Sequence, residues 1–317
     1  MAQGRDHSGG MKKKRSRFHN KGSVNLGDMG KEVLEKLDEN SQVVKQFRGY
    51  AAELDDKHDR FERIVKVSRD ITIESKRIIF LLHTLDKKEK QESVLTDAGN
   101  RLQNVCKNSF RSIAKELHGH DVYQYIRAYK PGVQEFVEAI TFHQYLQSKS
   151  LQSWREIEKS FNYTLVENAK SSSGAKIPAD QEIKSACNQE TKTLNDEKKS
   201  IRTPLIPHDY IMGIADLTGE LMRKCINNLA SGNIAGCFET CAFVRSMYRG
   251  FLGCAGVSGK EINRKLYTLK QSLSKIENVC YTIKIRGSEI PKHMLATVAI
   301  ADAEENAVDD DEGYQHY

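Results

Sequence analysis

The stretch GVQEFVEAITFHQYL, residues 132–146, decides the fold class, because its spacing indicates a helix with apolar side chains on two opposite faces. At 100° per residue, one face is wholly apolar and consists of Val133, Phe136, Val137 and Ile140. The opposite face is mixed and consists of Glu135, Glu138, Phe142, Tyr145 and Leu146. If this second face also lies inside the protein, its carboxylates need a cation, a proton or dense hydrogen bonding.

Helical periodicity recurs along the rest of the chain, and no segment shows sustained period-2 alternation. Apolar seams run through residues 47–65, 71–85 and 102–117, and further helices are expected near 154–161, 209–229, 238–251 and 267–283. Pro131 falls where we expect the first turn of the helix over 132–146, a position that tolerates proline. The sequence therefore predicts an all-α fold, a single helical bundle domain of about seven helices.

Composition shifts divide the chain into three parts. Residues 1–30 form a basic arm that we expect to be disordered, with a dense run at Lys12, Lys13, Lys14, Arg15 and Arg17. Such a run serves nuclear import or nucleic-acid contact, and a plain solvated arm is the alternative. Residues 31–300 form the helical domain, interrupted by a polar segment at 168–205 that we expect to be a flexible loop. Residues 301–317 form an acidic tail.

The composition, 38% hydrophobic and 29% charged, is typical of a soluble protein. No stretch approaches the roughly 20 apolar residues of a membrane span, and no signal-peptide core is evident. The seven cysteines are scattered, which favours reduced thiols in a cytosolic or nuclear protein. Cys225, Cys237 and Cys241 could share a metal site, but no histidine or second cysteine pair completes it, so buried thiols are favoured.

Two pairs of acids carry the strongest chemical signal. Glu135 and Glu138 are spaced i, i+3, and Asp216 and Glu220 in GIADLTGELMRK are spaced i, i+4, so each pair shares one side of its helix. If the two helices pack face to face, four carboxylates converge, and a divalent cation is the usual relief of their repulsion. Oxygen-only ligands suit Mg²⁺ or Mn²⁺, which could activate a water against a phosphodiester.

Structural salt bridges are the competing interpretation, since Glu220 could pair with Arg223 or Lys224 along its own helix. Gly213 and Gly219 flank the second pair at a cost of roughly 1 kcal/mol each in a helix interior. Such a cost makes sense where another backbone or a substrate comes close.

Other motifs are weaker. The sequence has no GxxxxGK[ST], GxSxG or HExxH motif, and no Glu-x-x-His spacing around the first acidic pair. Residues 68–83, SRDITIESKRIIFLLH, place Arg69, Lys76, Arg77 and His83 along one helix. That arrangement could bind a nucleic-acid backbone, and a solvated face is the alternative.

Four long segments resemble the translin family. They are DKHDRFERIVKVSRDITIESKRIIFLLH, GVQEFVEAITF, GIADLTGELMRKCIN and KLYTLKQSLSKIENVCYTIKIRGSEIPKHML. The resemblance runs from about residue 46 to 296 and is weakest in the loop at 168–205. The basic KKKRSR run is also similar to a nuclear-import segment found in the family.

The resemblance implies an all-α fold and assembly with translin into a hollow hetero-octamer that binds single-stranded RNA and DNA. It implies that this chain is the Mg²⁺-dependent endoribonuclease subunit, present in cytoplasm and nucleus. The implied roles are removal of the nicked passenger strand from an Argonaute-containing silencing complex and processing of transfer RNA. The family's catalytic, metal-binding acids fall on Glu135, Glu138, Asp216 and Glu220. This full acidic set favours the catalytic subunit over the RNA-binding paralogue.

Two alternatives stay open. The chain could be a non-catalytic partner of translin in assembly and nuclear transport, with structural acids. It could also be an all-α nucleotide pyrophosphohydrolase, which uses Glu-x-x-Glu on one helix and acids on a second. Those second acids usually follow within a few tens of residues, whereas about eighty residues separate Glu138 from Asp216 here. No histidine stands out as a general base.

Overall fold

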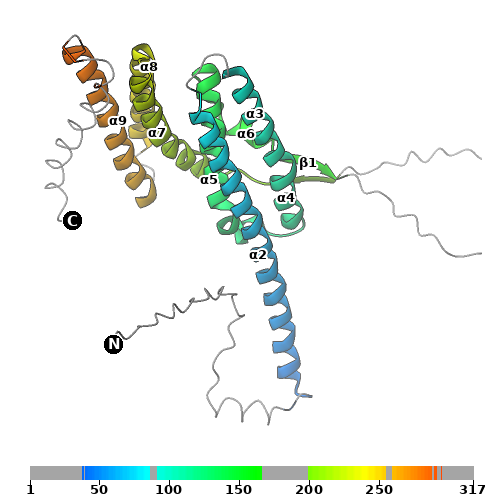
Figure 1. The fold of residues 1–317 in the computed structure, drawn as a ribbon. Helices are drawn as coiled ribbons and strands as arrows, with labels where there is room; N and C mark the ends of the chain where they lie inside the picture. Colours follow the sequence, from blue (N-terminus) through cyan, green and yellow to red (C-terminus); the bar gives the residue numbers. More distant parts are fainter. Residues whose placement is uncertain are drawn as a thin grey trace, which may run out of the picture. The chain divides into compact units, whose positions relative to one another are not determined.

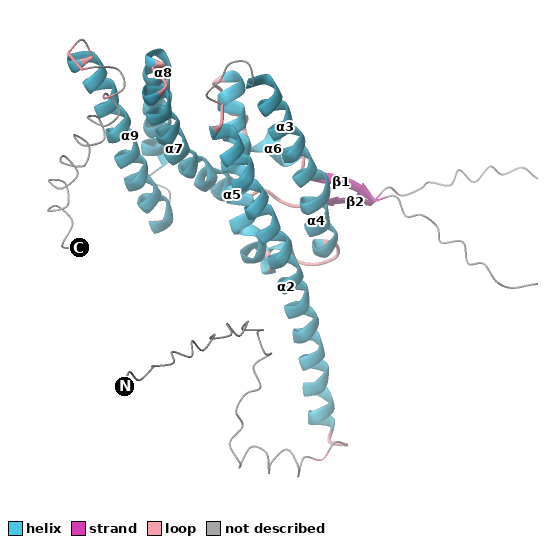
Figure 2. Cartoon of the chain, viewed as in Figure 1, coloured by secondary structure: helices cyan, strands magenta, loops and turns pink. Residues whose placement is uncertain are grey.

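The computed structural model describes residues 38, 40–85, 91–165, 199–254, 259–287, 289–290 and 294. The chain divides into two compact units, Met1–Asp56 and Lys57–Tyr317. The helices are α2 (Gln42–His83), α3 (Gln91–Asn104), α4 (Arg111–Leu117), α5 (Ile126–Ser148), α6 (Trp154–Lys159), α7 (Pro207–Ala230), α8 (Ile234–Cys254) and α9 (Lys260–Arg286). A π-helical turn, η2 (Val105–Phe110), joins α3 to α4, and a 3₁₀ turn, η3 (Val122–Gln124), precedes α5. The predicted all-α class is confirmed (Figures 1 and 2).

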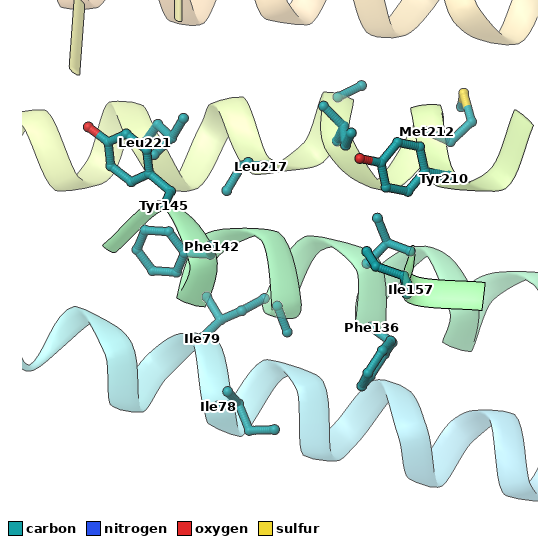
Figure 3. Close-up of a cluster of buried hydrophobic side chains, with 14 of the residues drawn as sticks. Ile78, Ile79, Phe136, Phe142, Tyr145, Ile157, Tyr210, Met212, Leu217 and Leu221 are labelled. Atoms are coloured by element: carbon teal, nitrogen blue, oxygen red, sulfur yellow. The ribbon is translucent and has the colours of Figure 1, made fainter. Parts of the chain in front are cut away.

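Helix α5 is buried on two sides, as its sequence predicts. Figure 3 shows α5 between α2 and α7, with Ile78 and Ile79 of α2 on one side of it and Leu217 and Leu221 of α7 on the other. Phe136 and Phe142 of α5 are fully buried, on opposite faces of the helix. Helices α8 and α9 pack against α7 and against each other. The mixed face of α5, which carries Glu135 and Glu138, therefore lies inside the bundle.

Gly213 sets how closely α5 and α7 approach. A Cβ atom at this position would lie 2.6 Å from the carbonyl oxygen of Gln134 and 2.7 Å from Cβ of Val137. Only a glycine fits so near another helix backbone, and this is one of the two roles that the sequence predicted for the flanking glycines. The contact lies beside Glu135 on α5 and one turn before Asp216 on α7, so it fixes the two acidic pairs in register.

Pro131 does not mark the start of α5, and that prediction was wrong. The helix begins at Ile126 and contains the proline in its interior. Ala128 and Tyr129, before the proline, are almost fully buried, and this packing offsets the cost of roughly 3 kcal/mol for an interior proline. On the α2 side, the Ser68 hydroxyl accepts a hydrogen bond from the Gly132 N–H at 3.1 Å.

A small antiparallel hairpin interrupts the helical architecture (Figure 2). Strand β1 (Asn162–Leu165) pairs with β2 (Lys199–Arg202), with Tyr163 opposite Ile201. The predicted flexible loop over 168–205 is therefore ordered at its end, while residues 166–198 lie outside the described residues. The end is held because the Thr203 hydroxyl donates to the Phe110 carbonyl oxygen at 2.8 Å and Ile201 is buried.

The unit Met1–Asp56 is described only from residue 38 onward, where α2 presents an exposed apolar row, Val43, Phe47, Tyr50 and Leu54. The predicted basic arm, including Lys12, Lys13, Lys14, Arg15 and Arg17, and the acidic tail at 301–317 lie outside the described residues. Among the described helices, none combines the length and the apolar character that a membrane span requires.

Candidate active site

The four predicted acids line a single pocket of about 550 Å³ in the unit Lys57–Tyr317. Glu135 and Glu138 reach it from α5, and Asp216 and Glu220 reach it from α7. The two sequence motifs, about eighty residues apart, are thus brought to one place by the close packing of α5 on α7.

Basic side chains from three helices pair with three of these acids. Lys76 Nζ on α2 lies 3.4 Å from Glu135 Oε2, and Lys265 on α9 forms an ion pair with Asp216. Glu220 Oε2 lies 3.5 Å from the Arg223 guanidinium, as the salt-bridge interpretation anticipated. These contacts give three of the carboxylates the cation that buried or half-buried acids require.

Glu138 differs from the other three acids. It is 9% exposed, and no hydrogen bond or ion pair of its carboxylate occurs within the described part of the chain. Burial, followed by the negative charges of Glu135, Asp216 and Glu220, raises the pKa of Glu138 to about 8. Near neutral pH this carboxylate therefore retains a proton, which a bound cation would displace.

The neighbouring acids are shifted in opposite directions. Burial raises the pKa of Glu135, and the ammonium of Lys76 offsets part of that rise. For Glu220, burial also acts upward on the pKa, but the hydrogen bond from His83 and the charge of Arg223 outweigh it, so the pKa is lowered. The pocket therefore places Glu138, whose pKa is raised to about 8, in one site with Glu220, whose pKa is lowered.

His83 is a pocket neighbour whose role the sequence did not reveal. We expected it on a nucleic-acid-binding face, but its side chain is only 9% exposed and its Nε2 lies 2.5 Å from Glu220 Oε2. Its ring packs against Phe142 with centroids 4.8 Å apart, which fixes its orientation. His83 follows Lys76 by seven residues on α2, so the two side chains lie on the same side of the helix. That spacing is a sequence feature that could have placed His83 near the pocket.

The donor set fits a hard divalent cation by its chemistry. All four side chains offer carboxylate oxygens, the ligands that Mg²⁺ and Mn²⁺ prefer. In their present rotamers, no three His, Cys, Asp or Glu side chains of the described residues stand close enough to hold one ion. Lys76 and Arg223 are 64% and 60% exposed, and exposed ion pairs are worth at most about 1 kcal/mol. A cation can therefore replace them at little cost.

Gly219 lines the pocket and has a different role from Gly213. A Cβ atom at Gly219 would meet nothing within 4 Å, so packing does not require the glycine. A helix-interior glycine costs roughly 1 kcal/mol, and here it leaves open space beside Asp216 and Glu220. The open space agrees with the other role considered from the sequence, room for a substrate, which stays a prediction.

One of the three basic α2 residues that we predicted to contact a nucleic-acid backbone lies at the pocket. Lys76 lines the pocket, whereas Arg69 and Arg77 lie on the exposed surface of α2. Arg77 is 68% exposed and its guanidinium lies 3.6 Å from Glu74.

Four cysteines of α7, α8 and α9 are buried free thiols: Cys225, Cys237, Cys241 and Cys280. Cys237 Sγ donates to the Cys225 carbonyl oxygen at 3.4 Å, and Cys280 Sγ donates to the Cys237 carbonyl oxygen at 3.7 Å. Burial raises the pKa of Cys280 to about 12. All six described cysteines are free thiols, and Cys187 lies outside the described residues.

A protein-family comparison decides what this bundle is. Residues 59–287, which contain all four acids, match the model of the Translin family. The chain belongs to the translin family. Its relatives include the translin-associated protein X of Pongo abelii, 41% identical over 309 residues and 98% of each chain. The protein of the same name from Mus musculus is 44% identical over 260 residues, covering 81% of this chain and 84% of that one.

A similar fold is also found among solved structures. The crystal structure of apo-NeC3PO has a TM-score of 0.51 and 17% sequence identity, covering 76% of this chain and 95% of that one. At this identity the likeness concerns the fold alone, and it agrees with the all-α class.

Proposed function

We propose that this translin-family chain is the catalytic subunit of a Mg²⁺-dependent endoribonuclease and acts on single-stranded or nicked RNA. The observation that supports this most is the pocket itself. Four carboxylates from two helices line it, and Glu138, buried among the other three, has a pKa of about 8. A fold that needed these acids only as salt-bridge partners would have no use for a fourth, unpaired one.

The chain's own residues account for the chemistry as follows. Glu135, Glu138, Asp216 and Glu220 would hold the ion, and Glu138 would release its proton to do so. The ion, when bound, makes a water nucleophilic and neutralises charge that develops on the phosphodiester. His83 keeps the Glu220 carboxylate oriented.

Lys76 and Lys265 would have one role in the pocket without an ion and another in the pocket with an ion bound. Without an ion they neutralise Glu135 and Asp216. Once those acids turn toward a cation, both ammonium groups become available to a phosphate at the pocket mouth. Mn²⁺ is expected to substitute for Mg²⁺, since both take oxygen ligands.

Translin is the proposed partner, because close relatives carry the name translin-associated protein X. The proposed assembly is a hetero-octamer that binds single-stranded RNA and DNA. We propose that this assembly acts on RNA in an Argonaute-containing silencing complex and in transfer-RNA processing, and that it is present in cytoplasm and nucleus.

The direct test is co-purification with translin followed by incubation with labelled single-stranded RNA. We expect cleavage in Mg²⁺ or Mn²⁺ and none in EDTA, because the carboxylates alone cannot activate water. Glu239→Gln removes an exposed acid of α8 away from the pocket and is the matched control, with unchanged cleavage. Cleavage that persists in EDTA would overturn the proposal, and hydrolysis of nucleoside triphosphates instead of RNA would favour a pyrophosphohydrolase.

A non-catalytic assembly role is the second candidate, because three of the four acids already have basic partners. If the Lys76–Glu135 and Lys265–Asp216 pairs only tie α2 to α5 and α9 to α7, neutralising Glu135 will loosen the assembly. The nuclease proposal expects an intact assembly that no longer cuts RNA, and size-exclusion chromatography beside the cleavage assay separates the two.

A further inference from the structure

One face of α2 combines basic and apolar side chains that the core does not use. Arg69, Ile73, Lys76 and Phe80 fall within about 60° of one another at 100° per residue, and we call these four residues the α2 strip. The opposite face of the same helix is fully buried and carries Ile71, Ser75, Ile78 and Leu82. All four strip residues are exposed, so the strip is a surface feature of the unit Lys57–Tyr317.

Phe80 is the unusual member of the strip. Its side chain is 74% exposed, yet it lines the same pocket as the four acids. Phe80 lies one helical turn beyond Lys76, whose ammonium reaches Glu135 inside the pocket. An aromatic ring therefore stands at the mouth of a pocket whose interior is acidic and whose edge is basic.

We infer that the α2 strip is a track for single-stranded RNA, with Phe80 as a stacking platform for the nucleobase beside the scissile phosphate. The inference rests on the proposed nuclease function, which it deepens by naming how the substrate is held. Lys76 and Arg69 would contact the backbone phosphates, and Arg69 to Phe80 spans about 16 Å of helix, enough to follow a strand rather than one nucleotide. Proteins that bind single strands without sequence preference combine basic and aromatic side chains in this way.

The surroundings of Phe80 favour a nucleic acid over a partner subunit. Lys76 and Arg223, which line the pocket, are each at least 60% exposed. The cores of protein–protein interfaces are depleted of lysine and of charge, whereas phosphates attract such groups. The open space above Gly219, which packing does not require, lies in the same pocket and gives the strand somewhere to enter.

The test uses the complete assembly with translin and three variants. Phe80→Trp keeps an aromatic face and supplies a fluorescent reporter, and Phe80→Leu keeps apolar bulk without the ring. Tyr123→Leu removes another highly exposed aromatic residue, on η3 and outside the pocket lining, and is the matched control.

Two readouts follow, one of which needs no cleavage. In EDTA, single-stranded RNA is expected to quench the emission of Phe80→Trp, measured as the difference from the unsubstituted assembly. In Mg²⁺, Phe80→Leu is expected to raise KM by about 5-fold to 150-fold, since stacking is worth about 1–3 kcal/mol per base. An abasic nucleotide next to the cut site should raise KM of the unsubstituted enzyme by the same factor and should hardly change KM of Phe80→Leu. On ordinary RNA, Tyr123→Leu should have the KM of the unsubstituted enzyme.

The outcomes separate this inference from the proposed function. Emission of Phe80→Trp that RNA leaves unchanged overturns the inference, and so does a tryptophan already shielded from acrylamide before RNA is added, because a partner subunit then covers the ring. Quenching by RNA in an assembly that never cleaves supports the track but overturns the nuclease proposal.

Discussion

Glu138→Gln is expected to abolish RNA cleavage by the assembly and to leave the assembly intact. The substitution removes the acid that lies among the other three, and an amide cannot replace a carboxylate in charge. Because the stabilisation that an ion supplies to a phosphodiester reaction is worth several kcal/mol, we expect a loss of about 1000-fold. The cleavage rate in Mg²⁺, measured beside Glu239→Gln, checks this result.

The same variant should change how stability depends on pH. The pKa of Glu138 is about 8 in the folded chain, against a usual value of 4.5. Between these values the folded chain holds a proton that the unfolded chain releases, so the free energy of unfolding falls as pH rises from 4.5 to 8. The slope is at most about 1.4 kcal/mol per pH unit, and Glu138→Gln should remove it.

Melting temperatures measured in EDTA from pH 5 to pH 8.5 test this second expectation. Near pH 8 the variant should melt at a higher temperature than the unsubstituted assembly, since it no longer buries a charge without a partner. If Glu138→Gln cuts RNA normally, or unfolds more readily than the unsubstituted assembly at every pH, Glu138 is not a cation-binding acid with a raised pKa.

Gly213→Ala is expected to destabilise the bundle strongly, and Gly219→Ala is expected to stabilise it. The two glycines lie six residues apart in α7, but only Gly213 faces a backbone, the carbonyl oxygen of Gln134 at 2.6 Å from the added Cβ. Overpacking of this kind costs about 1–3 kcal/mol, whereas the open space at Gly219 lets alanine regain roughly 1 kcal/mol of helix propensity.

Thermal unfolding of the two variant assemblies provides the comparison. Gly213→Ala should also reduce cleavage, because a wider spacing between α5 and α7 separates Glu135 and Glu138 from Asp216 and Glu220. Equal melting temperatures for the two variants would show that α5 and α7 do not approach as closely as the structure has them.

Local patterns predicted the parts of the structure that depend on one helix at a time. The two apolar faces of residues 132–146 and the pairing of the acids on one side of each helix follow from a period of 3.6. Gly213 was predictable as a site of close approach, because a glycine in a helix interior needs a reason.

Contacts between distant residues were not predictable in this way. His83 and Glu220 are 137 residues apart in sequence, and nothing in either segment names the other as its partner. The ion pair between Lys265 of α9 and Asp216 was unpredictable for the same reason, because it depends on helix packing that no local sequence pattern encodes. Pro131 misled because a proline at a helix start and one tolerated by tertiary packing look alike in sequence. The hairpin strands, four residues each, are too short to show alternation.

The central claim is that carboxylates from α5 and α7 hold one site for a divalent ion, and Mn²⁺ binding to the assembly tests it most directly. Electron paramagnetic resonance counts bound Mn²⁺ without any need for cleavage. We expect the unsubstituted assembly to bind Mn²⁺ and the double variant Glu138→Gln, Asp216→Asn to lose that binding while Glu239→Gln keeps it. Equal Mn²⁺ binding by all three assemblies would contradict the account.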